Sequence, residues 1–152
     1  MLTGMRLFLD TCSLNRLWDD QKQVRVHLEA ESVIYILDSA KRGKEELVSS
    51  DYLLAEILDN PDPVRRADVM TLLRPAVLNI SEHPDIEQRA SELKEWNITD
   101  FDALHVAAAE AASCDYLLTT DDKFFRRAAR AGGAIHVKVL NPFDYPRSSP
   151  PS

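Results

Sequence analysis

The sequence contains only two cysteines, Cys12 and Cys114, which lie far apart and in no CxxC spacing. This scarcity excludes a disulfide framework and a cysteine-based zinc site, and it fits a reducing, cytoplasmic location. Long hydrophobic runs are also missing. The first ten residues hold one basic residue and a very short apolar run before Asp10, so neither a signal peptide nor a membrane span is predicted.

Positive charge is in short supply as well. The chain has 18 Lys and Arg against 25 Asp and Glu, which gives a formal net charge of -7. Such a balance argues against a protein that coats nucleic acid through its overall field, although it leaves room for a small local basic patch. If some of the acids form a metal cluster, bound divalent ions would offset part of this negative charge.

The length of 152 residues corresponds to one domain with a substantial core, which we place at residues 1–145. The Pro- and Ser-rich residues 146–152 are expected to form a flexible tail. Short apolar runs alternate with amphipathic stretches, so the sequence predicts an α/β fold with a central parallel five-stranded sheet and right-handed crossovers.

The elements follow from apolar periodicity and from Gly, Pro and Asp at the breaks. Strands are predicted over residues 6–9, 46–49, 76–80, 116–120 and 135–140, the first of them central. Helices are predicted over residues 14–18, 24–41, 64–73, 84–96 and 123–130. A further helix starts at Asp51, and an alanine-rich one follows Thr99.

The stretch 98–125 contains two acids that can reach the same edge of the sheet. Asp102 lies at the start of the alanine-rich helix, and Asp121 follows the next strand. Ligands of open parallel sheets collect outside the carboxyl ends of the strands. Two carboxylates aimed at one point are costly unless a cation lies between them, so a metal ion is predicted here.

Asp10 and Glu56 come from two further elements that can face this edge. Asp10 ends the first strand, and Glu56 lies on the helix after the second. Oxygen ligands of this kind suit Mg²⁺ or Mn²⁺ rather than zinc. The hydroxyls of Thr119 and Thr120 reach the same edge, where they could hold a carboxylate or a metal-bound water.

Each of these acids also has a purely structural interpretation. Asp10 could be the N-cap of the next helix, Glu56 a solvated helix position, and either Asp121 or Asp122 a cap. Asp102 completes a T-x-x-D capping box with Thr99, beside the cap-region acid Asp100. His105 is interpreted as a core or interface residue rather than as a ligand.

Four motifs occur in order along the chain: LFLDTCSL, SSDYLLAEIL, TDFDALHVAAA and YLLTTDDKFF. Together they resemble the motifs of PIN-domain nucleases, including the toxin halves of VapBC-type toxin-antitoxin pairs, from Arg6 to about Asp144. The resemblance implies a three-layer α/β/α sandwich and a metal-dependent endoribonuclease that leaves 5′-phosphate and 3′-hydroxyl ends. It also implies an RNA substrate, and an antitoxin protein is a possible partner. We expect a homodimer and no contact with a membrane.

The resemblance implies that the family's acidic residues fall on the same four acids that face the predicted sheet edge. The metal ligands and catalytic residues implied are Asp10, Glu56, Asp102 and Asp121. Supporting positions are Thr11, Thr119 and Asp122, and the choice between Asp121 and Asp122 as the main ligand stays open.

A basic patch is predicted on the helix that follows Asp121. The spacing of its cationic residues places them on one helical face, which begins at the metal edge and could hold RNA. They are Lys123, Arg126, Arg127 and Arg130.

Two other functions compete with the nuclease. A haloacid-dehalogenase-like phosphatase would also use an aspartate at the end of the first strand, but it needs a second aspartate where Cys12 stands. A catalytically silent binding module with the same fold is the other alternative. The presence of all four expected acids speaks against it.

Overall fold

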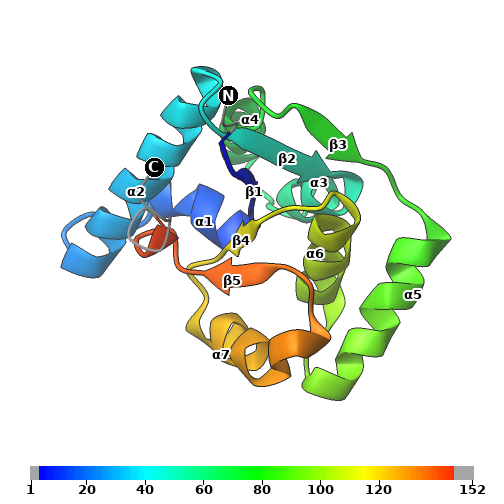
Figure 1. Cartoon of the computed structure of the whole chain (residues 1–152). Helices are drawn as coiled ribbons and strands as arrows, with labels where there is room; N and C mark the ends of the chain where they lie inside the picture. Colours follow the sequence, from blue (N-terminus) through cyan, green and yellow to red (C-terminus); the bar gives the residue numbers. More distant parts are fainter. Residues whose placement is uncertain (1–3, 146–152) are drawn as a thin grey trace.

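A single parallel sheet forms the centre of the computed structural model, which describes residues 4–145. Its five strands lie in the order β3-β2-β1-β4-β5 (Figure 1), and all neighbours are parallel. The strands are β1 (Arg6–Leu9), β2 (Glu46–Ser50), β3 (Leu78–Ile80), β4 (Tyr116–Leu118) and β5 (Lys138–Leu140). The predicted five-stranded sheet with a central first strand is therefore confirmed.

Helices cover both faces of this sheet and give the three-layer α/β/α arrangement. The α-helices are α1 (Thr11–Asn15), α2 (Val24–Lys41), α3 (Asp51–Leu58), α4 (Pro63–Leu72), α5 (Pro84–Glu92), α6 (Asp100–Ala111) and α7 (Asp122–Ala131). The 3-10 helices are η1 (Arg16–Trp18), η2 (Leu93–Trp96) and η3 (Gly132–Ala134). In Figure 1, α2 lies on one side of the strands, α5 and α6 lie on the other, and α7 lies beside β5.

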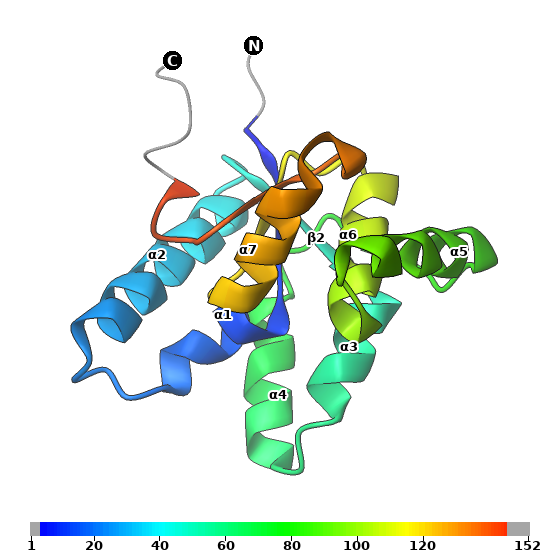
Figure 2. The same cartoon turned by 90° about the horizontal axis from the view of Figure 1, so that it is seen from below.

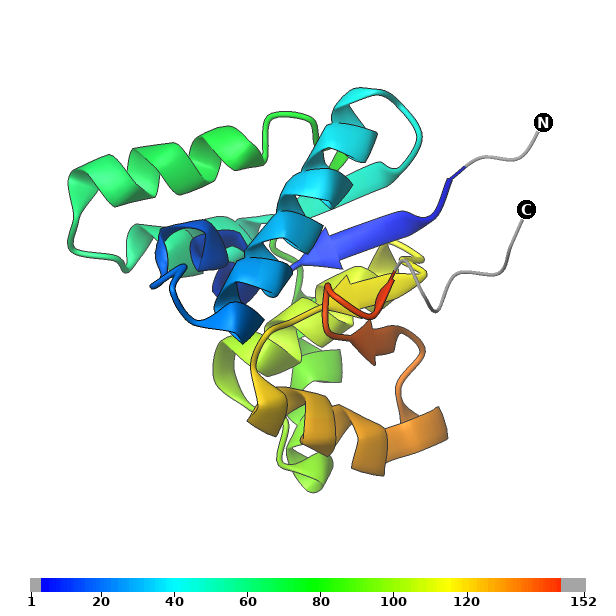
Figure 3. The same ribbon diagram turned by 90° about the vertical axis from the view of Figure 1, so that its left-hand side faces the viewer.

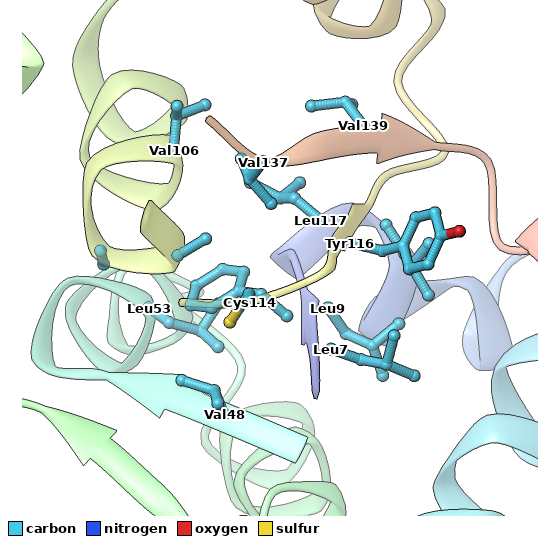
Figure 4. Close-up of a cluster of buried hydrophobic side chains, with 14 of the residues drawn as sticks. Leu7, Leu9, Val48, Leu53, Val106, Cys114, Tyr116, Leu117, Val137 and Val139 are labelled. Atoms are coloured by element: carbon cyan, nitrogen blue, oxygen red, sulfur yellow. The ribbon is translucent and has the colours of Figure 1, made fainter. Parts of the chain in front are cut away.

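Strand register sorts the core into two faces. Phe8 pairs with Val48 on one neighbour and with Leu117 on the other, so their side chains share a face. Leu7 belongs to the opposite face. Figure 4 shows Leu7 on the other side of β1 from Val48, and all these side chains are buried. Apolar burial on both faces is typical of a parallel sheet between helical layers.

The carboxyl ends of the strands open toward α1, α3 and α4. Figure 2 shows the chain passing down from β1 into α1, with α3 and α4 at the same end of the molecule. Figure 3 shows α2 crossing in front of β1, whose arrowhead points toward that end. No helix among residues 4–145 has the length and apolarity needed to cross a membrane.

Several element bounds differ from prediction. The helix predicted at 14–18 begins at Thr11, because Asp10 caps it, and it continues as 3-10 turns from Arg16. The third, fourth and fifth strands are three residues long, shorter than predicted. Two of them, β3 and β5, are edge strands, which are often short. The tail predicted at 146–152 lies outside the described residues.

Candidate active site

The chain leaves two neighbouring strands, β1 and β4, in opposite directions along the sheet. Ligands of such sheets bind in the crevice at this switch point. Asp10 follows β1, and its backbone N–H donates to the carbonyl of Leu118 at the end of β4, with an N to O distance of 3.2 Å. The hydroxyl of Ser13 donates to the same carbonyl at 2.9 Å. Two distant segments are thus fixed to each other at the switch point.

The carboxylate of Asp10 is buried at this position, and the residue is only 2% exposed. It accepts a hydrogen bond from the backbone N–H of Ser13 at 2.9 Å, so Asp10 is the N-cap of α1. Burial raises the pKa of Asp10 to about 6, although hydrogen bonds from the Thr119 hydroxyl and from Ser13 act in the opposite direction. The cap alternative is therefore real, and it coexists with a carboxyl that is costly to ionise without a cation.

The neighbouring acids Asp121 and Asp122 have different hydrogen-bond partners. The carboxylate of Asp121 accepts from the backbone N–H groups of Lys123 and Phe124 at 2.9 and 3.3 Å, which caps α7. The carboxylate of Asp122 instead forms two hydrogen bonds with the guanidinium of Arg25, at 2.6 and 2.7 Å, and these hold its pKa below the usual range. Of the two acids, Asp121 is the one whose charge acts on Asp102 of α6 and on Cys12.

The carboxylate of Asp102 has no hydrogen-bond partner among the described residues, and the expected capping box is wrong. The Thr99 side chain makes no cap hydrogen bond, because the backbone of Asp100 adopts a left-handed φ of 54° that alters the entry to α6. Burial raises the pKa of the half-buried Asp102 to about 7, and the charge of Asp10 raises it further. The Asp102 carboxyl therefore has no capping or pairing role that would explain its half-buried position.

Glu56 extends from α3 toward α6. Its Oε1 lies 2.8 Å from Nε2 of His105, and it also accepts a hydrogen bond from the hydroxyl of Thr11. Burial would raise the pKa of Glu56, but the hydrogen bond and charge of His105, with the Thr11 hydroxyl, outweigh it and lower the pKa. These contacts contradict the alternative in which Glu56 is only a solvent-exposed position on a helix.

The charges of four carboxylates act on the thiol of Cys12. Burial of the sulfur and their charges raise the pKa of this thiol to about 12, although the residue as a whole is exposed. The four acids, in order of effect, are Asp10, Asp121, Glu56 and Asp102. The structure therefore brings together the charges of the four acids selected from the sequence.

These acids do not form a closed ligand shell. Within residues 4–145, no three His, Cys, Asp or Glu side chains lie close enough together to hold a metal ion. The donor chemistry nevertheless fits a hard divalent cation, because all four are oxygen donors. Burial raises the pKa of Asp10 and of Asp102, so ionising both carboxyls at this place is costly. A bound cation would offset that cost.

The predicted basic patch lies on α7 as expected from its spacing. Lys123, Arg126 and Arg130 are exposed and Arg127 is half-buried. None of the four forms an ion pair with another residue of the described chain, so their charges remain available to a ligand. Helical spacing keeps them away from the side of α7 that buries Phe124.

A cleft of about 570 Å³ opens next to the switch point. Thr119 and the paired Arg25 and Asp122 line it, together with apolar side chains from α2 and α7. Three of these apolar residues are exposed to an unusual extent: Val24, Leu28 and Phe125. An apolar cleft beside a candidate site is typical of a surface that a partner covers.

Sequence reasoning missed two residues of this site, His105 and Arg25. His105 was interpreted as a core residue, although its spacing of three from Asp102 places both on one face of α6. That spacing was the available signal. Arg25 gave none, because its pairing with Asp122 joins positions 97 apart.

Comparison with known proteins is consistent with the fold. A sequence model described as "PIN domain" matches residues 7–131. No curated protein matches the chain. Two solved structures resemble it. VapBC2 from Rickettsia felis, bound to a DNA fragment from its promoter, is 16% identical with a TM-score of 0.59, over 90% of this chain and 98% of that one. VapBC-1 from nontypeable Haemophilus influenzae is 18% identical with a TM-score of 0.58, over 91% and 98%.

Proposed function

Since this chain belongs to the PIN-domain family, we propose that it is a metal-dependent endoribonuclease and the toxin of a toxin-antitoxin pair. One observation carries the proposal. The charges of Asp10, Glu56, Asp102 and Asp121 all act on the Cys12 thiol, which follows β1, and burial raises the pKa of Asp10 and of Asp102. Family membership removes the phosphatase alternative, which rested on another fold family.

The four acids would hold Mg²⁺ or Mn²⁺. Such an ion polarises a phosphodiester and lowers the pKa of a bound water. The chain's own residues position these ligands. Thr119 and Ser13 hold the Asp10 carboxylate, and Thr11 holds Glu56. The ion pair of Asp122 with Arg25 speaks against Asp122 as the main ligand, so we propose Asp121 for that role.

RNA would approach along the basic face of α7. The helix follows its N-cap Asp121, which is one of the proposed metal ligands, and three of its four cationic residues are exposed. Contacts of this kind bind phosphates without reading sequence. They would also help to attract an anionic substrate to a protein with a net charge of -7.

An antitoxin would cover the cleft beside the switch point. The two similar solved structures are both VapBC structures, which supports a protein partner for this chain. The exposed Val24, Leu28 and Phe125 give such a partner an apolar surface. Co-expression with the product of a small neighbouring reading frame should yield a stable complex, and Leu28→Asp should weaken it. The homodimer and the cytoplasmic location stay predictions.

Cleavage of a short single-stranded or looped RNA tests the enzymatic proposal. Mg²⁺ or Mn²⁺ should support cleavage, EDTA should abolish it, and the products should carry 5′-phosphate and 3′-hydroxyl ends. Asp10→Asn serves as the inactive control, since it removes one ligand charge. Cleavage that persists in EDTA, or cyclic phosphate products, would contradict the metal mechanism. A protein that folds but cleaves no RNA under any of these conditions would favour the silent module.

A further inference from the structure

His105 occupies an enclosed slot in the core, beside the candidate site. The whole residue is buried, with 0% of its surface exposed. The ring lies next to Phe8, with centroids 5.4 Å apart, and stacks on Phe101 with centroids 6.0 Å apart. Two aromatic neighbours leave the imidazole a narrow choice of orientation.

Packing alone does not account for a histidine in this slot. Nδ1 is buried and has no hydrogen-bond partner among the described residues. An unsatisfied buried polar atom costs free energy that a Leu or Phe at the same place would avoid. The polar ring therefore has a use that offsets this cost. Within residues 4–145, its one polar contact runs from Nε2 to Glu56.

That contact acts on one oxygen of the Glu56 carboxylate. Nε2 of His105 and the hydroxyl of Thr11 both meet Oε1. The other oxygen, Oε2, has no hydrogen-bond partner within residues 4–145. The carboxylate is thus fixed from one side while its second oxygen remains available.

The contact also links two of the four acids through one helix. Asp102 and His105 are three residues apart on α6, so this helix supplies one acid directly and contacts a second through the imidazole. Glu56 lies on α3, which packs against α6. The relative position of two candidate ligands is therefore determined by the α3 to α6 interface.

We propose that His105 is a positioning residue, which orients Glu56 through Oε1 so that Oε2 is presented to the metal ion. The inference rests on the proposed function, because it assumes that Glu56 is a ligand. His105 itself is not a ligand, since Nε2 is engaged by Glu56 and the ring is enclosed by Phe8 and Phe101. Residues that orient metal ligands in this way typically change metal affinity about 10- to 100-fold when removed.

Two amide substitutions of different reach provide the test. His105→Gln can place its amide N–H near the position of Nε2, whereas His105→Asn is one methylene shorter and cannot. Both put a polar amide into the same slot, so their general effect on the core is similar. The exposed His136→Gln serves as the matched control away from the site. Mn²⁺ affinity is measured by electron paramagnetic resonance on metal-free, folded protein.

We expect H136Q to bind Mn²⁺ like the wild type, H105Q to stay within about threefold of it, and H105N to bind at least about tenfold more weakly. If H105N does not fold, the apolar His105→Met takes its place with the same expectation. Equal Mn²⁺ affinity for all folded variants would overturn the positioning role and leave the proposed function intact. Absence of Mn²⁺ binding by the wild type would overturn the proposed function itself.

Discussion

Arg25 and Asp122 form a two-point ion pair that joins the first turn of α2 to the first turn of α7. The pair engages both carboxylate oxygens of Asp122, which favours Asp121 as the ligand candidate. Their side chains are 53% and 52% exposed, so the pair contributes little to stability.

Replacing these two neighbouring acids should therefore have opposite consequences. Asp122→Asn should cost less than about 1 kcal/mol of unfolding free energy and leave RNA cleavage nearly unchanged. Asp121→Asn should keep the α7 cap, because Asn caps as well as Asp, yet lose cleavage and Mn²⁺ binding. Urea unfolding and a cleavage assay on both variants check this. An inactive D122N beside an active D121N would reverse the assignment.

The second prediction concerns pH. The pKa of Asp10 is raised from 3.8 to about 6 by burial, so the folded protein holds this proton more tightly than the unfolded chain. The associated stability is fully present below the unfolded value and is lost as the pH rises through about 6. The shift corresponds to a loss of about 3 kcal/mol. Without metal, Asp10→Asn should match the wild type near pH 4 and be more stable near pH 7.

Urea titrations in EDTA at several pH values measure this difference. Adding Mn²⁺ at pH 7 should stabilise the wild type more than D10N, because binding to the folded state adds to its stability and D10N has lost a ligand charge. An Asp102→Asn variant should behave in the same direction, since the pKa of Asp102 is raised to about 7. A pH-independent gap between D10N and wild type would show that the carboxyl is not buried as described.

The third prediction concerns the basic face of α7. Changing Arg126 and Arg130 together to Gln should weaken RNA binding and flatten its dependence on salt, because fewer counterions are displaced from the RNA. Mn²⁺ affinity should stay the same. The control is the double change of Lys41 and Lys44 to Gln, which removes the same charge from exposed positions at the other end of α2. Equal salt slopes for the two double variants would place the RNA on another surface.

Local sequence features predicted the five-stranded sheet with its central first strand, but they did not predict the side-chain contacts between elements. The position of Asp10 at the end of the first strand was predicted correctly, because the apolar run ends at this residue. The pairing of β1 with β2 and β4 then places Asp10 at the switch point. The capping box at Thr99 failed because the φ of Asp100 depends on how α6 meets the fold, which no capping pattern records. His105 was read as a core residue, and it is buried, but its contact with Glu56 depends on the packing of α3 against α6.

The pairing of β1 with β4 also has a consequence for synthesis of the chain. Strand β1 is made first, but its partner begins at Tyr116, so the ribosome adds more than a hundred residues before the two can meet. Closing so long a loop is slow and entropically unfavourable. A nascent chain that ends before β4 carries Asp10 and Glu56 but lacks the carbonyl of Leu118 that fixes Asp10. The proposed site can therefore assemble only after the segment that contains β4 has been synthesised, so a shorter nascent chain holds these acids without their final arrangement.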